Sequence, residues 1–226
     1  MDPLIAEDLT LLLLDDEKGT FRASSYLATV LGGAVLIELA LTEAATVEEK
    51  TSMWRSAKVH AESGPPPADP VLAEALRTVA EKDRSADDLV DRLGKGLKET
   101  LTDRLVERGI LDRQQDKVLG LFPRTRWPMT DATHEQEVRR QVTAALVQGT
   151  EPDPRTAALV ALLAAVDQAH QVIDHEGVSS REVKRRAKQI ADGAWAATGV
   201  RDAITASMVA VTAAVSVATT AAVISG

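Results

Sequence analysis

The sequence predicts a mainly α-helical protein: a compact helical bundle with a buried C-terminal helix and a protruding β-hairpin. Aromatic residues make up only 3% of the chain although 45% of it is hydrophobic, so aliphatic residues and Ala must build the core. Such a composition suits helix packing better than a β-sandwich. Connectors are short and no repeat is visible, which predicts a single domain over residues 1–226. There is no Cys and therefore no disulfide.

The N-terminal third contains two apolar segments. Residues 9–14 form an apolar run that closes at an acidic turn ending at Gly19. Ser24 or Ser25 can cap a helix over residues 26–41, which is apolar nearly all round and therefore predicted to be buried. Residues 46–62 are expected to form short strands or turns, followed by a rigid proline-rich connector.

Clear capping signals mark the middle of the chain. Asp69 caps a helix through Glu81 with Pro70 at its first position, and Ser85 caps the next helix. A further helix over 97–108 is ended by Gly109. Two strands around a loop are expected between residues 110 and 131. Helices are then predicted at 133–148, 154–174, 179–197 and 201–223.

The C-terminal segment has no charge from Ala203 onward and is long enough to span a bilayer. It lacks Leu and Phe and is diluted by Ser and Thr, so a helix buried in the domain is favoured over a tail anchor. The N-terminus has no cationic region before its apolar run, and we do not expect a signal peptide. We expect a cytoplasmic protein. The absence of Asn, with abundant Ala and Arg, suggests a bacterial source.

Residues 117–128 form the most informative segment. It has no acidic residue, and Gly and Pro exclude a helix there. A turn that exposes apolar groups and cations together predicts contact with an anionic membrane surface. The alternative is a hairpin that packs on a second copy of the chain through Phe122 and Trp127. The membrane-contacting candidates are Lys117, Val118, Leu119, Leu121, Phe122, Arg124, Arg126 and Trp127.

Charge is unevenly distributed. The chain carries −8 overall, but residues 92–128 hold nine Lys and Arg against five Asp and Glu, which leaves −12 on the rest. This predicts one anion-contacting face and argues against nucleic-acid binding. Lys95 and Lys98, three apart at a predicted helix start, could form a phosphate cradle with the helix amides. The alternative is an ordinary solvated helix face.

Signatures of catalysis are lacking. His134-Glu135 has Val138 where a zinc-protease helix needs its second His, and Gly94-Lys95-Gly96 lacks the spacing of a phosphate loop. No Ser lies in a nucleophile elbow. The three carboxylates at residues 15–17 could bind a metal, but a turn closed by Gly19 explains them equally well. We therefore expect a non-enzyme without metal or cofactor.

Six segments, in this order, resemble the Golgi phosphoprotein 3 family. They are LTLLLLDDEKG (9–19), GGAVLIELAL (32–41), DPVLAEAL (69–76), LVERGIL (105–111), VLGLFPRTRWP (118–128) and DPRTAALVALL (153–163). The resemblance implies a helical fold with a protruding hairpin. It also implies a phosphoinositide-binding peripheral membrane protein, because eukaryotic members bind phosphatidylinositol 4-phosphate and hold glycosyltransferase tails.

The resemblance also implies site residues. An Arg pair of the family's lipid pocket falls at Lys95 and Lys98, while a pocket Trp and a pocket Arg fall at Ala23 and Gly32. These two positions therefore differ from the family, and Arg22 directly precedes Ala23. We expect a lipid-binding adaptor on the inner face of a membrane, with anionic phospholipid and protein cargo as partners. The hairpin is also implied to contribute to self-association, so a homo-oligomer through it is a further expectation.

Two other functions stay open. A winged-helix DNA-binding protein would place Arg124 and Arg126 on a wing. However, Glu99, Asp103 and Glu107 on the preceding helix and the net charge oppose this, and we expect no nucleic-acid partner. The second alternative is a protein adaptor or scaffold with no lipid role.

Overall fold

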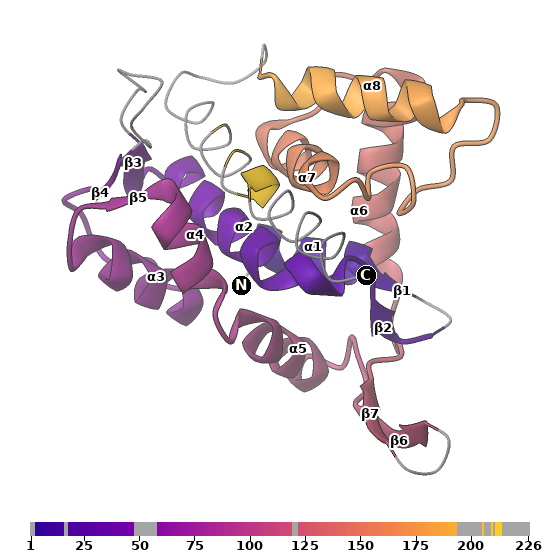
Figure 1. Cartoon of the computed structure of the whole chain (residues 1–226), viewed down its shortest axis with the longest axis horizontal. Helices are drawn as coiled ribbons and strands as arrows, with labels where there is room; N and C mark the ends of the chain where they lie inside the picture. Colours follow the sequence, from indigo (N-terminus) through magenta and orange to yellow (C-terminus); the bar gives the residue numbers. More distant parts are fainter. Residues whose placement is uncertain are drawn as a thin grey trace, which may run out of the picture.

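The computed structural model describes residues 3–15, 18–47, 58–118 and 122–193, together with 205, 209 and 211–213 (Figure 1). It is mainly α-helical. The helices α1 (Ile5–Leu13) and α2 (Leu27–Leu41) pack against each other and cross the middle of the molecule. Both are buried along nearly their whole length, as the uniform apolar pattern of residues 26–41 predicts. The apolar run at 9–14 forms most of α1 and leads into β1 (Leu14–Asp15), which pairs with β2 (Thr20–Phe21).

The central helix α2 contacts α4 (Ala86–Gly94) very closely. A Cβ atom on Gly32 would lie 2.0 Å from the carbonyl oxygen of Val90, and one on Gly94 would lie 2.0 Å from that of Ala28. No side chain fits at either position without moving a helix. Position 32 therefore faces α4, and cannot contribute a side chain to a surface pocket.

The predicted capping signals are confirmed. Asp69 accepts a hydrogen bond from the backbone N–H of Val71 at the start of α3 (Pro70–Ala80), and Ser85 accepts one from Asp88 at the start of α4. Helix α5 (Leu97–Glu107) begins after Gly96, whose φ is +74°. The short strands expected between residues 46 and 62 are β3 (Ala45–Val47) and β4 (Lys58–Ala61), joined by β5 (Arg84–Ser85).

The predicted hairpin is present between residues 110 and 131. Strands β6 (Gln114–Val118) and β7 (Phe122–Arg126) pair antiparallel, with Val118 opposite Phe122. Figure 1 shows this hairpin standing out from the helical body, on the side of β1, β2 and the end of α5. Residues 119–121, which connect the two strands, lie outside the described residues.

The C-terminal half packs α6 (Thr133–Thr143), the π-helical segment η2 (Ala144–Gln148), α7 (Pro154–Ala165) and α8 (Ser180–Ala191) onto α1 and α2. The predicted helix over 154–174 is too long. Helix α7 ends at Ala165 because Asp167 adopts a left-handed conformation with φ of +53°. The N–H of Gln168 then donates to the carbonyl of Leu163, and that of Asp167 to Ala164, which is a Schellman ending.

The predicted buried helix at the C-terminus falls mostly outside the described residues. The predicted helix over 179–197 is too long, because α8 ends at Ala191 and Gly193 then adopts a left-handed conformation with φ of +75°. Among the residues that are described there, Val211 is fully buried in the core and Val209 is exposed. In the described part of the chain, one helical segment, Ser24–Leu41, is long and apolar enough to cross a bilayer. Of these 18 residues, 67% are buried inside the protein, as is also typical of a core helix.

Candidate functional site

The base of the hairpin meets the first turn of α5 through a cation and two aromatic rings. The ammonium nitrogen of Lys98 lies 4.8 Å from the ring centre of Trp127 and 5.6 Å from that of Phe21. The two rings are 5.5 Å apart and tilted by 52°. Both arrangements are favourable, because a cation is attracted to the face of a ring and tilted rings pair edge to face. We call Phe21, Lys98 and Trp127 the hairpin-base cluster.

Trp127 is held inside the protein, and the prediction that it contacts a membrane is wrong. Its side chain is 9% exposed and packs with Leu11, Leu14, Leu105, Ile110 and Leu111. Its backbone N–H donates to the carbonyl of Gly19 over 2.8 Å. In the sequence Trp127 belongs to the same apolar segment as the tip of the hairpin. However, it directly follows the last residue of β7, Arg126, so it lies at the base of the hairpin.

Arg22 lies next to this cluster, because it follows Phe21 in the chain. Its guanidinium forms an ion pair with Asp15 over 3.1 Å, and Asp15 is also 3.8 Å from the ammonium of Lys18. The side chain of Arg22 is about one third exposed. Arg22 thus adjoins the cluster along the chain, with one carboxylate already beside it, and the ammonium of Lys98 lies 3.7 Å from a carboxylate oxygen of Glu99.

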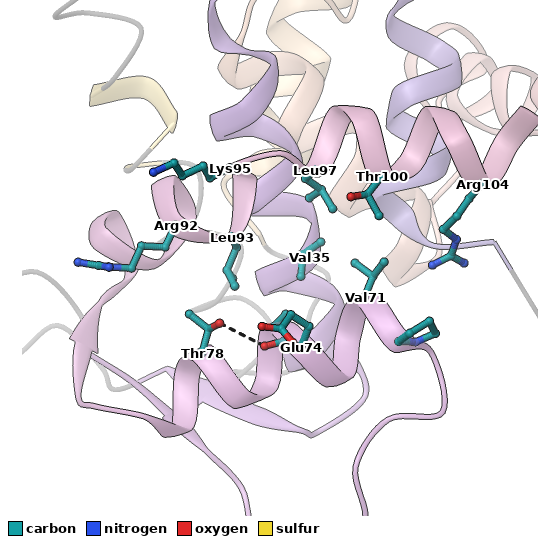
Figure 2. Close-up of a pocket in the computed structure, with 12 residues that line it drawn as sticks. Val35, Val71, Glu74, Thr78, Arg92, Leu93, Lys95, Leu97, Thr100 and Arg104 are labelled. Atoms are coloured by element: carbon teal, nitrogen blue, oxygen red, sulfur yellow. Dashed lines mark hydrogen bonds between the residues drawn. The ribbon is translucent and has the colours of Figure 1, made fainter. Parts of the chain in front are cut away.

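Lys95 and Lys98 do not share a helix, and that premise of the phosphate-cradle prediction is wrong. Lys95 is the C-terminal cap of α4, whereas Lys98 lies in the first turn of α5. The left-handed Gly96 separates the two helices, so three-residue helical spacing does not apply to the pair. Lys95 is exposed and lines a pocket of about 500 Å³ bordered by α2, α3, α4 and α5 (Figure 2).

Two cations of the hairpin, Arg124 and Arg126, share an acid. The carboxylate of Asp116 on β6 accepts two hydrogen bonds from Arg124 on β7, over 2.9 and 3.0 Å, and lies 3.0 Å from Nε of Arg126 as an ion pair. The hydrogen bonds from Arg124 hold the pKa of Asp116 below its usual range. Asp116 directly precedes the acid-free segment, so the sequence pattern overstated the charge of the hairpin. The predictions for the side chains of Lys117, Val118, Leu119, Leu121 and Phe122 fall outside the described residues.

A buried charge network, which the sequence analysis did not predict, holds α1 in place. Asp8 is almost fully buried and bonds His134 of α6 over 2.6 Å and Arg155 of α7 over 2.7 Å. Arg155 also reaches Glu38 of α2 over 3.2 Å. Burial raises the pKa of Glu38 more than the N–H of Ile5 and the nearby Arg155 lower it. The only sequence signal was the acidic pair inside an otherwise apolar run.

The adjacent Glu7 extends this network to α5. It is fully buried and forms ion pairs with Arg104 over 3.4 Å and Arg108 over 3.2 Å. Arg104 in turn donates hydrogen bonds to both carboxylate oxygens of Asp69.

In the described part of the chain, no group of three or more His, Asp or Glu side chains is placed to hold a metal ion.

Fold and site together describe a helical protein whose protruding hairpin is anchored beside a cationic surface. The model of one family, described as Golgi phosphoprotein 3 (GPP34), matches residues 5–207, which is nearly the whole chain. The chain therefore belongs to the Golgi phosphoprotein 3 family, which is not known as a family of enzymes. A search of curated proteins found no match to the chain.

Proposed function

We propose that this protein is a non-enzymatic peripheral membrane protein. It binds anionic phospholipid on the inner face of a membrane, with a headgroup like that of phosphatidylinositol 4-phosphate. The observation that carries the proposal is the position of Lys98 over the rings of Phe21 and Trp127. This contact places a cation of α5 at the base of the protruding hairpin. One anionic surface can then meet the hairpin and Lys98 together, and Arg22, which follows Phe21 in the chain, is the further cation that we assign to it.

The start of α5 adds to the attraction for phosphate. No side chain caps this helix, and Gly96 presents its first turn without a bulky neighbour. Free amide groups and the positive end of the helix dipole favour an anion there. Lys95 ends α4 only three residues earlier and supplies another exposed cation. Lys offers a point charge and lacks the planar, two-pronged hydrogen-bonding geometry of Arg. We therefore expect this surface to select ligands by negative charge more than by the shape of the headgroup.

The expected affinity is low and reversible. Trp127 is not available for insertion, which leaves residues at the tip such as Leu121 and Phe122, each worth about 1.5–3 kcal/mol if fully buried in the bilayer. Each free cation near an anionic leaflet adds about 1 kcal/mol. Ordering and lost translational freedom oppose both terms. The sum resembles the binding of a single acyl chain, about 10⁴ M⁻¹.

Co-sedimentation with vesicles tests the proposal. Phosphatidylcholine vesicles with and without phosphatidylglycerol or phosphatidylinositol 4-phosphate are compared at low and high salt. We expect sedimentation only with the anionic vesicles, weakened by salt because exposed charges are screened. Lys98→Glu should weaken it, whereas Lys82→Glu, an exposed cation after α3, should weaken it less.

Two controls make the outcome decisive. Lys98→Met keeps the apolar stem over the rings and should weaken sedimentation without loss of helical circular dichroism. Binding that is independent of lipid charge, salt and Lys98 would refute the proposal. A duplex-DNA gel shift is expected to show no complex, and a salt-dependent complex there would favour the winged-helix alternative instead.

A further inference from the structure

The pocket beside Lys95 has an apolar floor. Figure 2 shows Val35 of α2, Val71 of α3, Leu93 of α4 and Leu97 of α5 converging on one space. Its volume of about 500 Å³ lies within the range of small-molecule sites, about 300–1,000 Å³. Leu93 and Val71 are only partly covered, so apolar surface is open to a ligand.

Charged side chains surround this floor, and most are already neutralised by neighbours. Arg92 is bound to Asp88 over 2.8 Å, and Arg104 is bound to Asp69 over 2.8 Å. The acid on the rim, Glu74, is paired with Arg77 of its own helix.

Lys95 is the exception on this rim. It is exposed, and no residue in the described ranges forms an ion pair or hydrogen bond with its ammonium. Figure 2 shows this ammonium at the edge of the pocket, directed away from the apolar floor. An unpaired Lys at a helix end is free to change rotamer, so it can turn toward a ligand at the mouth. The pocket therefore offers apolar contact and one uncompensated positive charge.

We propose that this pocket binds a single-chain amphiphile with one anionic group, such as a long-chain carboxylate. The chain lies on Val35, Val71, Leu93 and Leu97, and the anionic group contacts Lys95 at the mouth. A ligand with several negative charges is disfavoured, because the other rim cations already hold carboxylates. A neutral ligand leaves Lys95 unused. Binding at this pocket does not require the protein to contact a bilayer.

Titration with soluble amphiphiles tests the inference without a membrane. Laurate, dodecanol and dodecyltrimethylammonium are titrated into the full chain by calorimetry, each below its critical micelle concentration. We expect saturable one-to-one binding of laurate, weaker binding of dodecanol and none of the cation. A separate arm with phosphatidylglycerol vesicles distinguishes a free amphiphile from a bilayer lipid as the source of the same chemistry.

Two variants locate the site. Thr100→Trp places a large side chain at an exposed position of the rim and should abolish laurate binding. Lys95→Glu should weaken it about tenfold, since an exposed attraction becomes a repulsion. Lys82→Glu is the matched control, and thermal melts by circular dichroism check folding. No saturable laurate binding, equal binding of dodecanol, or full binding by Thr100→Trp would each overturn the inference.

Discussion

The carbonyl oxygen of Val90 lies where the side chain of residue 32 would begin, 2.0 Å from the Cβ position of Gly32. Helices α2 and α4 can approach this closely only because Gly32 and Gly94 have no side chains. The resemblance placed a pocket Arg of the family at position 32. In this protein that position serves helix packing, and the cations that we propose for an anionic ligand are Lys95, Lys98 and Arg22 instead.

Gly32→Ala is therefore expected to destabilise the fold by about 3 kcal/mol, the upper end for overpacking, because a backbone carbonyl must move. Gly64→Ala is the control, since a Cβ atom there meets nothing within 4 Å. Denaturant unfolding followed by circular dichroism gives both free energies. Equal stability of the two variants would show that α2 and α4 are less tightly packed than described.

Trp127→Ala is expected to lower the free energy of unfolding by about 3–5 kcal/mol, as for other large-to-small changes in a core. Its ring contributes to the cluster beneath the hairpin. Lys98→Met, which removes only the cation, should cost about 0.5–1 kcal/mol. Thermal and urea unfolding measure both. If Trp127→Ala kept wild-type stability but lost vesicle binding, the result would instead support Trp127 as a membrane-contacting residue.

Arg155→Met should destabilise the protein by about 3–5 kcal/mol, because Asp8 and Glu38 would stay buried without their shared cation. The control is Arg140→Met, which breaks an exposed pair with Glu137 and should cost less than about 1 kcal/mol. Combining Arg155→Met with Asp8→Leu should recover part of the loss. Chemical denaturation of wild type, Arg155→Met, Asp8→Leu and the double variant tests the coupling.

Asp69 should make stability depend on pH at acidic values. Burial alone would raise the pKa of this carboxyl, but the hydrogen bonds from Arg104 and from the N–H of Val71 outweigh it and lower the pKa below 3.8. The contribution of Asp69 is thus present above the unfolded pKa and lost as pH falls through the lowered folded value. The stability difference between wild type and Asp69→Asn should shrink over that range. A difference independent of pH would contradict this.

Asp116→Asn should strengthen binding to anionic vesicles about fivefold, because removing one negative charge near the surface is worth about 1 kcal/mol. It also releases Arg124 and Arg126 from their shared carboxylate. Asp167→Asn, at the end of α7, changes the net charge equally and should have little effect. Co-sedimentation at several salt concentrations compares the two. Equal gains would mean that net charge, and not the hairpin, controls binding.

Local signals in the sequence predicted much of the fold. The cap formed by Asp69 and Pro70, the apolar run of α2 and the turn residues of the hairpin act within a few positions of each other. The length of α7 was not predicted because the left-handed residue that ends the helix is Asp167, where a Gly would have been the recognisable signal.

The candidate site was less predictable, because its geometry depends on distant partners. Lys98 was identified by charge, but its place over Phe21 and Trp127 requires the packing of β2, β7 and α5. Trp127 was assigned to the wrong surface for the same reason. The pairing of Asp116 with Arg124 follows from strand register, which depends on where the turn begins.

The buried partners of Asp8 lie 126 and 147 residues further along the chain. During synthesis on the ribosome, α1 emerges before α6 and α7 and cannot reach these charge partners until both have been made. Contacts between residues so far apart in the chain form slowly, because a long loop must close first. We therefore expect α1 to pack on α2 early and its charge pairs with α6 and α7 to form late.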